Sequence, residues 1–175
     1  LALDNVSASF ESGKVHALVG KNGSGKSTLM KIISGAYTAD EGEIIYDGQT
    51  MKFKDPMSAA AQGIATVYQE LSLVPTMSVT ENILMGRMPK KGKLIDWKSA
   101  KKQVKELLKE LEIDIDPDKN VEELSMWQRQ MVEIAKAMSF NPKVLQFDEP
   151  TSSLASHEVE MLFQMIRRLK EKGVI

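Results

Sequence analysis

The residues best placed to do chemistry form a glycine-rich octapeptide, GKNGSGKS, at positions 20–27. Its glycines let the backbone curl so that successive N–H groups point inward at phosphate oxygens. Lys26 supplies a mobile positive charge for the terminal phosphates of a nucleotide, and the Ser27 hydroxyl can ligate Mg²⁺. The alternative, a plain turn rich in glycine and serine, is disfavoured because the full pattern arises by chance in roughly 1% of chains of this length. The sequence therefore predicts a site for ATP and Mg²⁺ whose nucleotide-binding residues are Gly20, Lys21, Asn22, Gly23, Ser24, Gly25, Lys26, Ser27 and Thr28.

Two adjacent carboxylates, Asp148 and Glu149, follow the apolar run at residues 144–147, which we expect to be a strand. Ligands of open parallel sheets bind at the carboxyl ends of the strands, so Asp148 is placed to hold Mg²⁺ directly or through water. Glu149 is placed to polarise a water molecule towards the γ-phosphate. The alternative is a pair of capping residues for the turn that follows. Gln146 interrupts the apolar run and needs a hydrogen-bond partner if it is buried.

Short apolar runs alternate with helical patterns, which predicts an α/β fold with a mainly parallel sheet. Residues 15–19 have the composition of a buried strand that leads into the glycine-rich loop, and a helix is expected from about residue 26 to residue 34. The dipeptide Asp47-Gly48 between two β-like runs predicts an antiparallel β portion near the N-terminus. These features together predict the core of a P-loop NTPase.

The middle of the chain changes character, because no convincing strand is predicted between about residues 69 and 142. Apolar residues recur there at the spacing of one helix face. They are Val104, Leu107, Leu108 and Leu111 in one segment, and Met131, Ile134, Ala135 and Met138 in another. We expect one partial domain, residues 1–175, in which 1–69 and 141–175 form the ATP-binding core and 70–140 an inserted helical subdomain.

The bulk composition is that of an ordinary globular domain and excludes several classes of function. The formal net charge of −1 gives no electrostatic case for a nucleic-acid partner. The chain contains no cysteine, which excludes disulfides and thiolate metal sites. No apolar run approaches the roughly 20 residues that a membrane-spanning helix needs. The first residue is not Met, and the apolar pair Val174-Ile175 is expected to open another strand, so both ends of the chain are predicted to be cut.

Four further motifs identify a resemblance. They are VYQE at 67–70, VTENI at 79–83, LSMWQRQ at 124–130 and DEPTSSL at 148–154. In this order and spacing they resemble the ABC ATPase family over essentially the whole chain. Residues 114–117 and 131–137 look most like the first nucleotide-binding half of two-cassette importers of galactose and ribose type.

The resemblance implies the remaining roles in the site. Gln69 would contact Mg²⁺ and the attacking water, which makes the implied metal ligands Ser27, Gln69 and Asp148 and the implied catalytic residues Glu149, Gln69 and Lys26. Ser125, in the signature segment, would contact the γ-phosphate held by a partner cassette. The implied activity is ATP hydrolysis that drives sugar import, with a second cassette and membrane permease subunits as partners, at the cytoplasmic face of the membrane.

This sequence departs from the family pattern at three positions. Met126 and Trp127 replace the two glycines of the usual signature, and Ala155 stands where an aspartate is usual. A tryptophan side chain near a phosphate is expected to weaken closure at that signature. The working site would then combine the phosphate loop of this half with the signature of the other half, and this chain alone is expected to hydrolyse ATP poorly.

Other functions remain open at this point. A non-transport ABC ATPase, acting in repair or translation, would share the same motifs but usually carries a longer insertion than residues 70–140. A nucleotide-gated switch with little turnover is compatible with the altered signature. A small-molecule kinase is disfavoured because the motifs at 67–70 and 148–154 have no role there.

Overall fold

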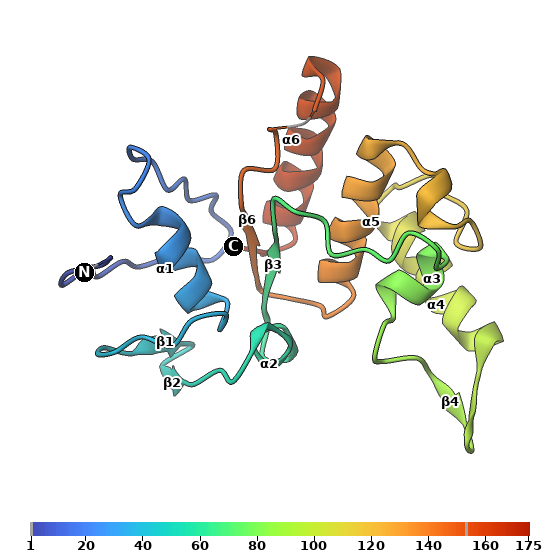
Figure 1. Ribbon diagram of the computed structural model, residues 1–175, viewed down its shortest axis with the longest axis horizontal. Coiled ribbons are helices and arrows are strands. Elements are labelled where there is room, and N and C mark those ends of the chain that lie inside the picture. The colour runs from blue at the N-terminus through green and yellow to red at the C-terminus, as the bar shows by residue number, and fades with distance from the viewer. Residues whose placement is uncertain (1, 153) are drawn as a thin grey trace.

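The computed structural model describes residues 2–152 and 154–175 (Figure 1). In chain order the elements are α1 (Lys26–Ile33), β1 (Ile44–Tyr46), β2 (Gln49–Met51), α2 (Pro56–Ala61), β3 (Ile64–Val67), α3 (Val79–Ile83), β4 (Lys90–Lys91), β5 (Leu94–Ile95), α4 (Trp97–Glu110), the 3₁₀ helix η1 (Val121–Glu123), α5 (Met126–Met138), β6 (Val144–Phe147) and α6 (Ser156–Glu171). β3 and β6 form a parallel pair, whereas β1–β2 and β4–β5 are antiparallel hairpins. The predicted α/β class, with a parallel pair and an early antiparallel portion, is confirmed.

The parallel pair β3–β6 lies at the centre of the molecule, between α1 on one side and the helices α3, α4 and α5 on the other (Figure 1). Its register places Val67 opposite Phe147, and the Asp148 N–H extends the ladder by donating to the carbonyl of Val67 at 3.0 Å. The Thr66 hydroxyl donates to Gln146 Oε1 at 2.8 Å. The polar residue that interrupts the apolar run therefore has its partner on the neighbouring strand, 80 positions earlier in the chain.

The helical region forms most of the hydrophobic core. α5 packs against β3 and α3, and α4 packs against α3. The predicted apolar faces are confirmed at their centres, since Val104, Leu108, Ile134 and Ala135 are buried. A mid-chain hairpin, β4–β5, was not expected from the sequence, which showed no convincing strand there. Its strands have only two residues each, too short to leave an alternating pattern.

The predicted strand at residues 15–19 is wrong. In the described part of the chain these residues join no β ladder, and the side chains of Val15 and Val19 are 61% and 91% exposed. A strand is stable only when a neighbouring backbone pairs with it and another layer covers its apolar side. No described segment pairs with residues 15–19, so the apolar composition alone does not make a strand here.

Other local predictions hold. The Asp47-Gly48 turn joins β1 to β2, with φ angles of 51° and 75°, the two positive values that a type I′ hairpin turn requires. The expected start of a strand at Val174-Ile175 appears as two backbone hydrogen bonds beside β6: Leu145 N–H donates to Ile175 O at 2.9 Å, and Ile175 N–H donates to Lys143 O at 2.7 Å. Among the described helices, none is both long enough and apolar enough to cross a membrane.

Candidate nucleotide-binding site

The glycine-rich loop has the backbone geometry that its sequence predicts. Gly23 and Gly25 have φ angles of 78° and 88°, in the left-handed region that disfavours side chains. A Cβ atom on Gly25 would lie 2.7 Å from Leu3 Cδ2 and 2.8 Å from the carbonyl oxygen of Ala2. A Cβ atom on Gly20 would lie 2.6 Å from Ser24 Oγ. The backbone conformation therefore favours glycine at positions 23 and 25, and the available space also excludes a side chain at position 25.

Helix α1 begins directly at the end of the loop, with Gly25 as its N-cap residue. No side chain caps its first turn, and the first intrahelical bond runs from Leu29 N–H to Gly25 O at 2.9 Å. The first N–H groups of an α-helix have no intrahelical acceptor and carry the positive end of the helix dipole. The loop and the helix start together present backbone donors of the kind that bind phosphate.

The side chain of Lys26 folds back over the loop. Its Nζ donates to the carbonyl oxygens of Gly20 at 2.8 Å and Lys21 at 3.0 Å. The ammonium group is thus held at the loop by two neutral acceptors in an exposed position. A phosphate oxygen carries a full negative charge and would compete well for the same donors.

The carboxylates Asp148 and Glu149 follow β6, as predicted. Asp148 is half-buried and Glu149 is exposed, and Glu149 has a φ of 46°, which is uncommon for a residue other than glycine. Because Val67 pairs with Phe147, the segment that holds Gln69 leaves β3 at the same edge at which Asp148 leaves β6. The structure therefore brings Gln69, Asp148 and Glu149 to one edge of the parallel pair. Among the hydrogen bonds and ion pairs of the described residues, none joins this edge to residues 20–28.

Ser125 and the two residues after it begin helix α5. The Ser125 hydroxyl accepts from Gln128 N–H at 3.2 Å, and Gln128 Oε1 accepts from Ser125 N–H at 3.0 Å, so the serine is an N-cap in a capping box. Trp127 is partly buried and packs against the hydrophobic core, whereas Met126 is 52% exposed. Of the two residues that replace the usual glycines, Met126 therefore has its side chain at the surface of the helix start, and Trp127 contributes to packing.

The carboxyl groups whose pKa values are shifted, Glu81 and Asp96, lie outside the candidate nucleotide-binding site. The pKa of Glu81 is lowered, first by a hydrogen bond from the Ser78 hydroxyl and then by one from the Ser78 N–H, as part of the capping box of α3. The pKa of Asp96 is lowered chiefly by the Ser99 N–H at the start of α4. Both shifts arise from helix caps, and neither indicates a catalytic group.

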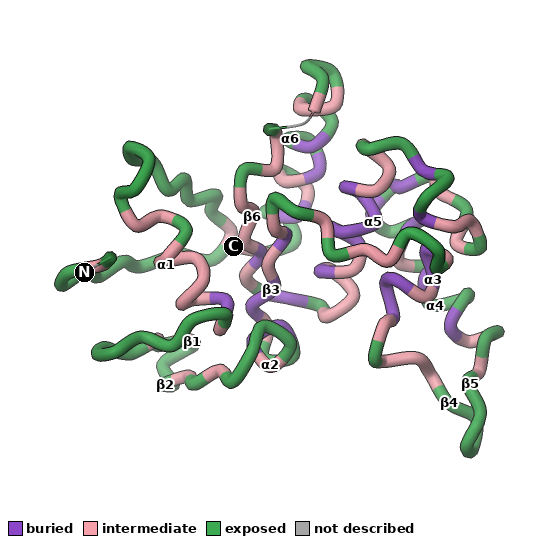
Figure 2. The backbone as a smooth tube through the Cα atoms, viewed as in Figure 1, coloured by how far each residue is buried: buried purple, intermediate pink, exposed green. Residues whose placement is uncertain are grey.

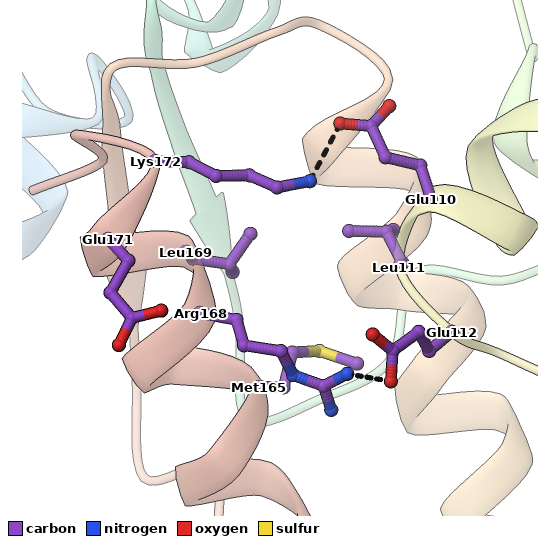
Figure 3. Close-up of a pocket in the computed structure, with 8 residues that line it drawn as sticks. All are labelled: Glu110, Leu111, Glu112, Met165, Arg168, Leu169, Glu171 and Lys172. Carbon is purple, nitrogen blue, oxygen red and sulfur yellow. Dashed lines mark hydrogen bonds and ion pairs between the residues drawn. The ribbon is translucent and has the colours of Figure 1, made fainter.

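A cavity of about 190 Å³ lies between the C-terminal ends of α4 and α6 (Figure 3). Lys172 donates to Glu110 at 2.9 Å beside it, and Arg168 forms an ion pair with Glu112. Its lining residues are Glu110, Leu111, Glu112, Met165, Arg168, Leu169, Glu171 and Lys172. None of the sequence-predicted site residues is among them, and the volume is below the roughly 300–1,000 Å³ of ligand pockets. The candidate nucleotide site is therefore the surface of the glycine-rich loop, where backbone donors converge, and not this cavity.

Two residues for which the sequence predicted no role in the site have buried polar side chains that bond to the segment after Gln69. Glu133 on α5 is 4% exposed, and Asn82 on α3 is fully buried. Both bond to the segment between β3 and α3, which follows Gln69. The sequence signals were a polar residue within a largely apolar helical pattern, as in MVEIAKAM at 131–138, and the position of both residues within the family-like segments 79–83 and 131–137.

Comparison with known proteins assigns the chain to one family and finds relatives of similar sequence along nearly all of it. The ABC transporter family matches residues 3–152. A putative ribose/galactose/methyl galactoside import ATP-binding protein from Agrobacterium fabrum is 51% identical over 173 residues, and an arabinose import ATP-binding protein from Vibrio parahaemolyticus is 48% identical over 174 residues. Each match covers 99% of this chain but 34% of the relative, so the chain spans about a third of the length of these proteins.

Solved structures show the same likeness in the fold. A nucleotide-free ATP-binding cassette of an ABC transporter has a TM-score of 0.84 and 31% identity, and another cassette in its ADP conformation has a TM-score of 0.83 and 34% identity. Both matches cover 99% of this chain and 72% of the solved chain. A dimeric cassette bound to ADP and phosphate has a TM-score of 0.79 and 29% identity, with 99% of this chain and 77% of that one covered.

Proposed function

The chain belongs to the ABC transporter family, and from this premise we propose that it binds Mg-ATP and, within its full-length protein, hydrolyses ATP to drive import of a sugar. The observation that carries the proposal is the complete phosphate loop, which has left-handed backbone at Gly23 and Gly25, has no room for a side chain at Gly25, and ends at the uncapped start of α1. The relatives named as sugar-import ATP-binding proteins, about half identical to this chain, support the transport role.

The residues of the loop fit a triphosphate and its metal ion. Backbone N–H groups of residues 20–27 and the ammonium of Lys26 are donors, and phosphate oxygens are acceptors that need several of them. The Ser27 hydroxyl and the Asp148 carboxylate are oxygen ligands, and Mg²⁺ typically takes one or two protein carboxylates together with phosphate oxygens and water. In this proposal Mg²⁺ supplies charge neutralisation between the phosphates, while Lys26, Ser27 and the loop hold the nucleotide in place.

Glu149 and Gln69 are proposed to act on the attacking water. Glu149 would accept its proton, and Gln69 would orient it and contact the metal ion. Both residues follow the carboxyl ends of paired parallel strands, which supports a shared position at the γ-phosphate. The left-handed backbone of Glu149 also supports the role, because strain of this kind costs of order 1–3 kcal/mol and clusters at functional sites.

The organisation of the full-length protein is part of the proposal. Residues 1–69 and 141–175 would form the ATP-binding core, and residues 70–140 the helical subdomain. The chain would be the first of two cassettes that pair to form composite sites, as the dimeric solved cassette and the threefold greater length of the relatives suggest. Ser125 would contact nucleotide held by the second cassette. Permease subunits would anchor the assembly at the cytoplasmic face of the membrane, as its relatives' role in import implies.

The proposed nucleotide site is tested in the full-length protein by the substitution Lys26→Ala, with Lys14→Ala as its control. Lys26→Ala is expected to weaken Mg-ATP binding by about a hundredfold or more, because a charged donor to the phosphates is lost. The melting temperature should change little, because the Lys26 side chain is only partly buried and its hydrogen bonds among the described residues go to loop carbonyls. Isothermal titration measures the affinity, and Lys14→Ala, which changes an exposed lysine outside the loop, is the control. Equal affinity in the two variants would contradict the proposed site.

A second function, a nucleotide-gated switch with little turnover, is favoured by one observation, the exposed Met126 at the start of α5. Glu149→Gln separates the two functions. If the protein is an ATPase, this variant should keep its Mg-ATP affinity and lose about 10²–10⁴-fold in turnover, the contribution of a general base. If the wild-type protein with its permease has no turnover for Glu149→Gln to reduce, the switch is the correct function.

A further inference from the structure

Ser72, three residues after Gln69, is held by helix α5 through all of its polar atoms. Its N–H donates to Glu133 Oε2 at 3.2 Å, and its hydroxyl donates to Glu133 Oε1 at 2.7 Å. The ammonium of Lys136 donates to the Ser72 carbonyl oxygen at 3.2 Å and to the Ser72 Oγ at 2.8 Å. Two side chains one turn apart on α5 therefore hold a single residue of the segment that leaves β3.

The burial of Glu133 makes this arrangement unusual. Its side chain is 4% exposed, between Val132 and Ile134, which are fully buried. A carboxylate loses its hydration when buried, and a hydrophobic residue in its place is often neutral or stabilising. Packing alone therefore does not explain why a glutamate occupies this position. Its two bonds to Ser72 and the nearby charge of Lys136 offset the cost, and they do so at a specific point of the chain.

The same segment is fixed at a second point. Asn82 of α3, which is fully buried, accepts from Val74 N–H at 2.7 Å and donates to the Val74 carbonyl oxygen at 3.0 Å. Ser72 is therefore fixed by α5 and Val74 by α3. Gln69 and Glu70, three and two residues before Ser72, are exposed. Any movement of Gln69 and Glu70 therefore takes place relative to a segment that is fixed at Ser72 and Val74.

Helix α5 extends from Ser125 to this anchor. Glu133 is eight residues after Ser125, a distance of about 12 Å along a helix that rises 1.5 Å per residue. A continuous helix is stiff over such a length, so a displacement at its start is carried to Glu133. The contact between Glu133 and Ser72 thus joins the two segments that carry Gln69 and Ser125.

We propose that Glu133 is a positioning residue, which together with Lys136 holds Ser72 and thereby fixes the Gln69 segment relative to the helix that begins at Ser125. This inference rests on the proposed function, in which Gln69 faces the nucleotide of this half and Ser125 faces the nucleotide of its partner. Glu133 would couple the position of Gln69 to that of Ser125 without contacting nucleotide itself.

The contact itself is tested without nucleotide, by hydrogen exchange at the Ser72 amide in the full-length protein. Glu133→Ala removes both carboxylate oxygens that accept hydrogen bonds from Ser72. It is expected to speed hydrogen exchange at the Ser72 amide at least about tenfold, because a hydrogen-bonded amide exchanges only when that hydrogen bond breaks. Glu133→Gln keeps one acceptor oxygen and should restore part of the protection. Glu106→Ala, a glutamate on the exposed face of α4, should leave Ser72 unchanged. Equal exchange at Ser72 in Glu133→Ala and Glu106→Ala overturns the proposal.

The positioning role is tested in the full-length protein with its permease, by comparing nucleotide affinity with turnover. In Glu133→Ala the affinity for Mg-ATP should stay within about twofold of wild type, because the phosphate loop is untouched, while kcat falls about tenfold. Glu133→Gln should recover part of kcat. A fall in kcat no larger than that of Glu106→Ala overturns the role.

Ser72→Ala provides a variant that replaces no buried residue, since Ser72 is exposed and only its hydroxyl is removed, while its N–H bond to Glu133 remains possible. It should lower kcat by a smaller factor than Glu133→Ala, again at unchanged affinity, and an unchanged kcat in this variant also counts against the role. Failure of the wild-type protein to bind Mg-ATP would refute the proposed function, whereas the exchange at Ser72 would still report whether the contact exists.

Discussion

The N-terminal region and the helical region of this chain are built in different ways. Among the described residues before Ala59, Ser34 alone is buried. Helix α5 by itself has seven buried residues: Gln130, Met131, Val132, Glu133, Ile134, Ala135 and Ala137. Figure 2 shows the contrast, with buried backbone concentrated around α5, α3 and the β3–β6 pair, and exposed or intermediate backbone along the first third of the chain.

This difference teaches that the candidate phosphate site does not depend on a core of its own. The loop is specified by local backbone features: positive φ angles at Gly23 and Gly25, and the start of α1. The helical region is specified by side-chain packing among residues far apart in the chain. Regions with few buried apolar contacts open most easily, and ligand-binding loops are commonly found among them. Substitutions in the two regions should therefore affect different properties.

The largest expected effect on stability comes from the helical region. Ile134→Ala removes a fully buried side chain and should lower the free energy of unfolding by about 3 kcal/mol, the sum of lost transfer free energy and the cavity that remains. Ile45→Ala makes the same chemical change at a residue that is 63% exposed, and should cost less than about 0.5 kcal/mol. Urea unfolding followed by circular dichroism measures both. Equal losses would remove the contrast between the two regions.

A substitution in the phosphate loop should act on binding instead. Gly25→Ala places a Cβ atom against Leu3 and the Ala2 carbonyl at a φ of 88°, which should distort the loop and weaken Mg-ATP binding by about a hundredfold. The unfolding midpoint of the helical region should not move. Gly42→Ala is the matched control, because its φ is 95° and a Cβ there meets no atom within 4 Å. If Gly25→Ala unfolds the helical region, the two regions are not independent.

The smallest expected effect concerns the start of α3, where the Ser78 hydroxyl caps the helix and bonds to Glu81. Ser78→Ala should cost about 1 kcal/mol at neutral pH, as the loss of an N-cap does. Because the pKa of Glu81 is lowered in the folded state from its ordinary 4.5, its contribution is present above that value and is lost as the pH falls below it.

The cost of Ser78→Ala should therefore shrink as the pH drops below about 4.5, the ordinary pKa of the Glu81 carboxyl. Unfolding curves at neutral and acidic pH measure this, with exposed Thr76→Ala as a nearby control. A cost that does not change with pH would show that the bond between the Ser78 hydroxyl and Glu81 contributes nothing to stability.

Local features of this protein were determined by the sequence alone. The glycine-rich loop, the start of α1, the Asp47-Gly48 hairpin and the apolar faces of α4 and α5 were all predicted, because each depends on residues within a few positions of one another. The roles proposed for Asp148 and Glu149 followed from their place after an apolar run. The strand predicted at residues 15–19 was wrong because it was inferred from local composition, whereas a strand requires a neighbouring strand to pair with.

Only the tertiary structure decided how distant segments meet. It gave Gln146 its partner in Thr66, packed Trp127 against the core while leaving Met126 exposed, and buried Glu133 against Ser72. These contacts join residues 61 to 80 positions apart, or depend on which side of a helix meets the core. No short-range pattern encodes such pairs, because hydrogen bonding and packing between them exist only after the chain has folded.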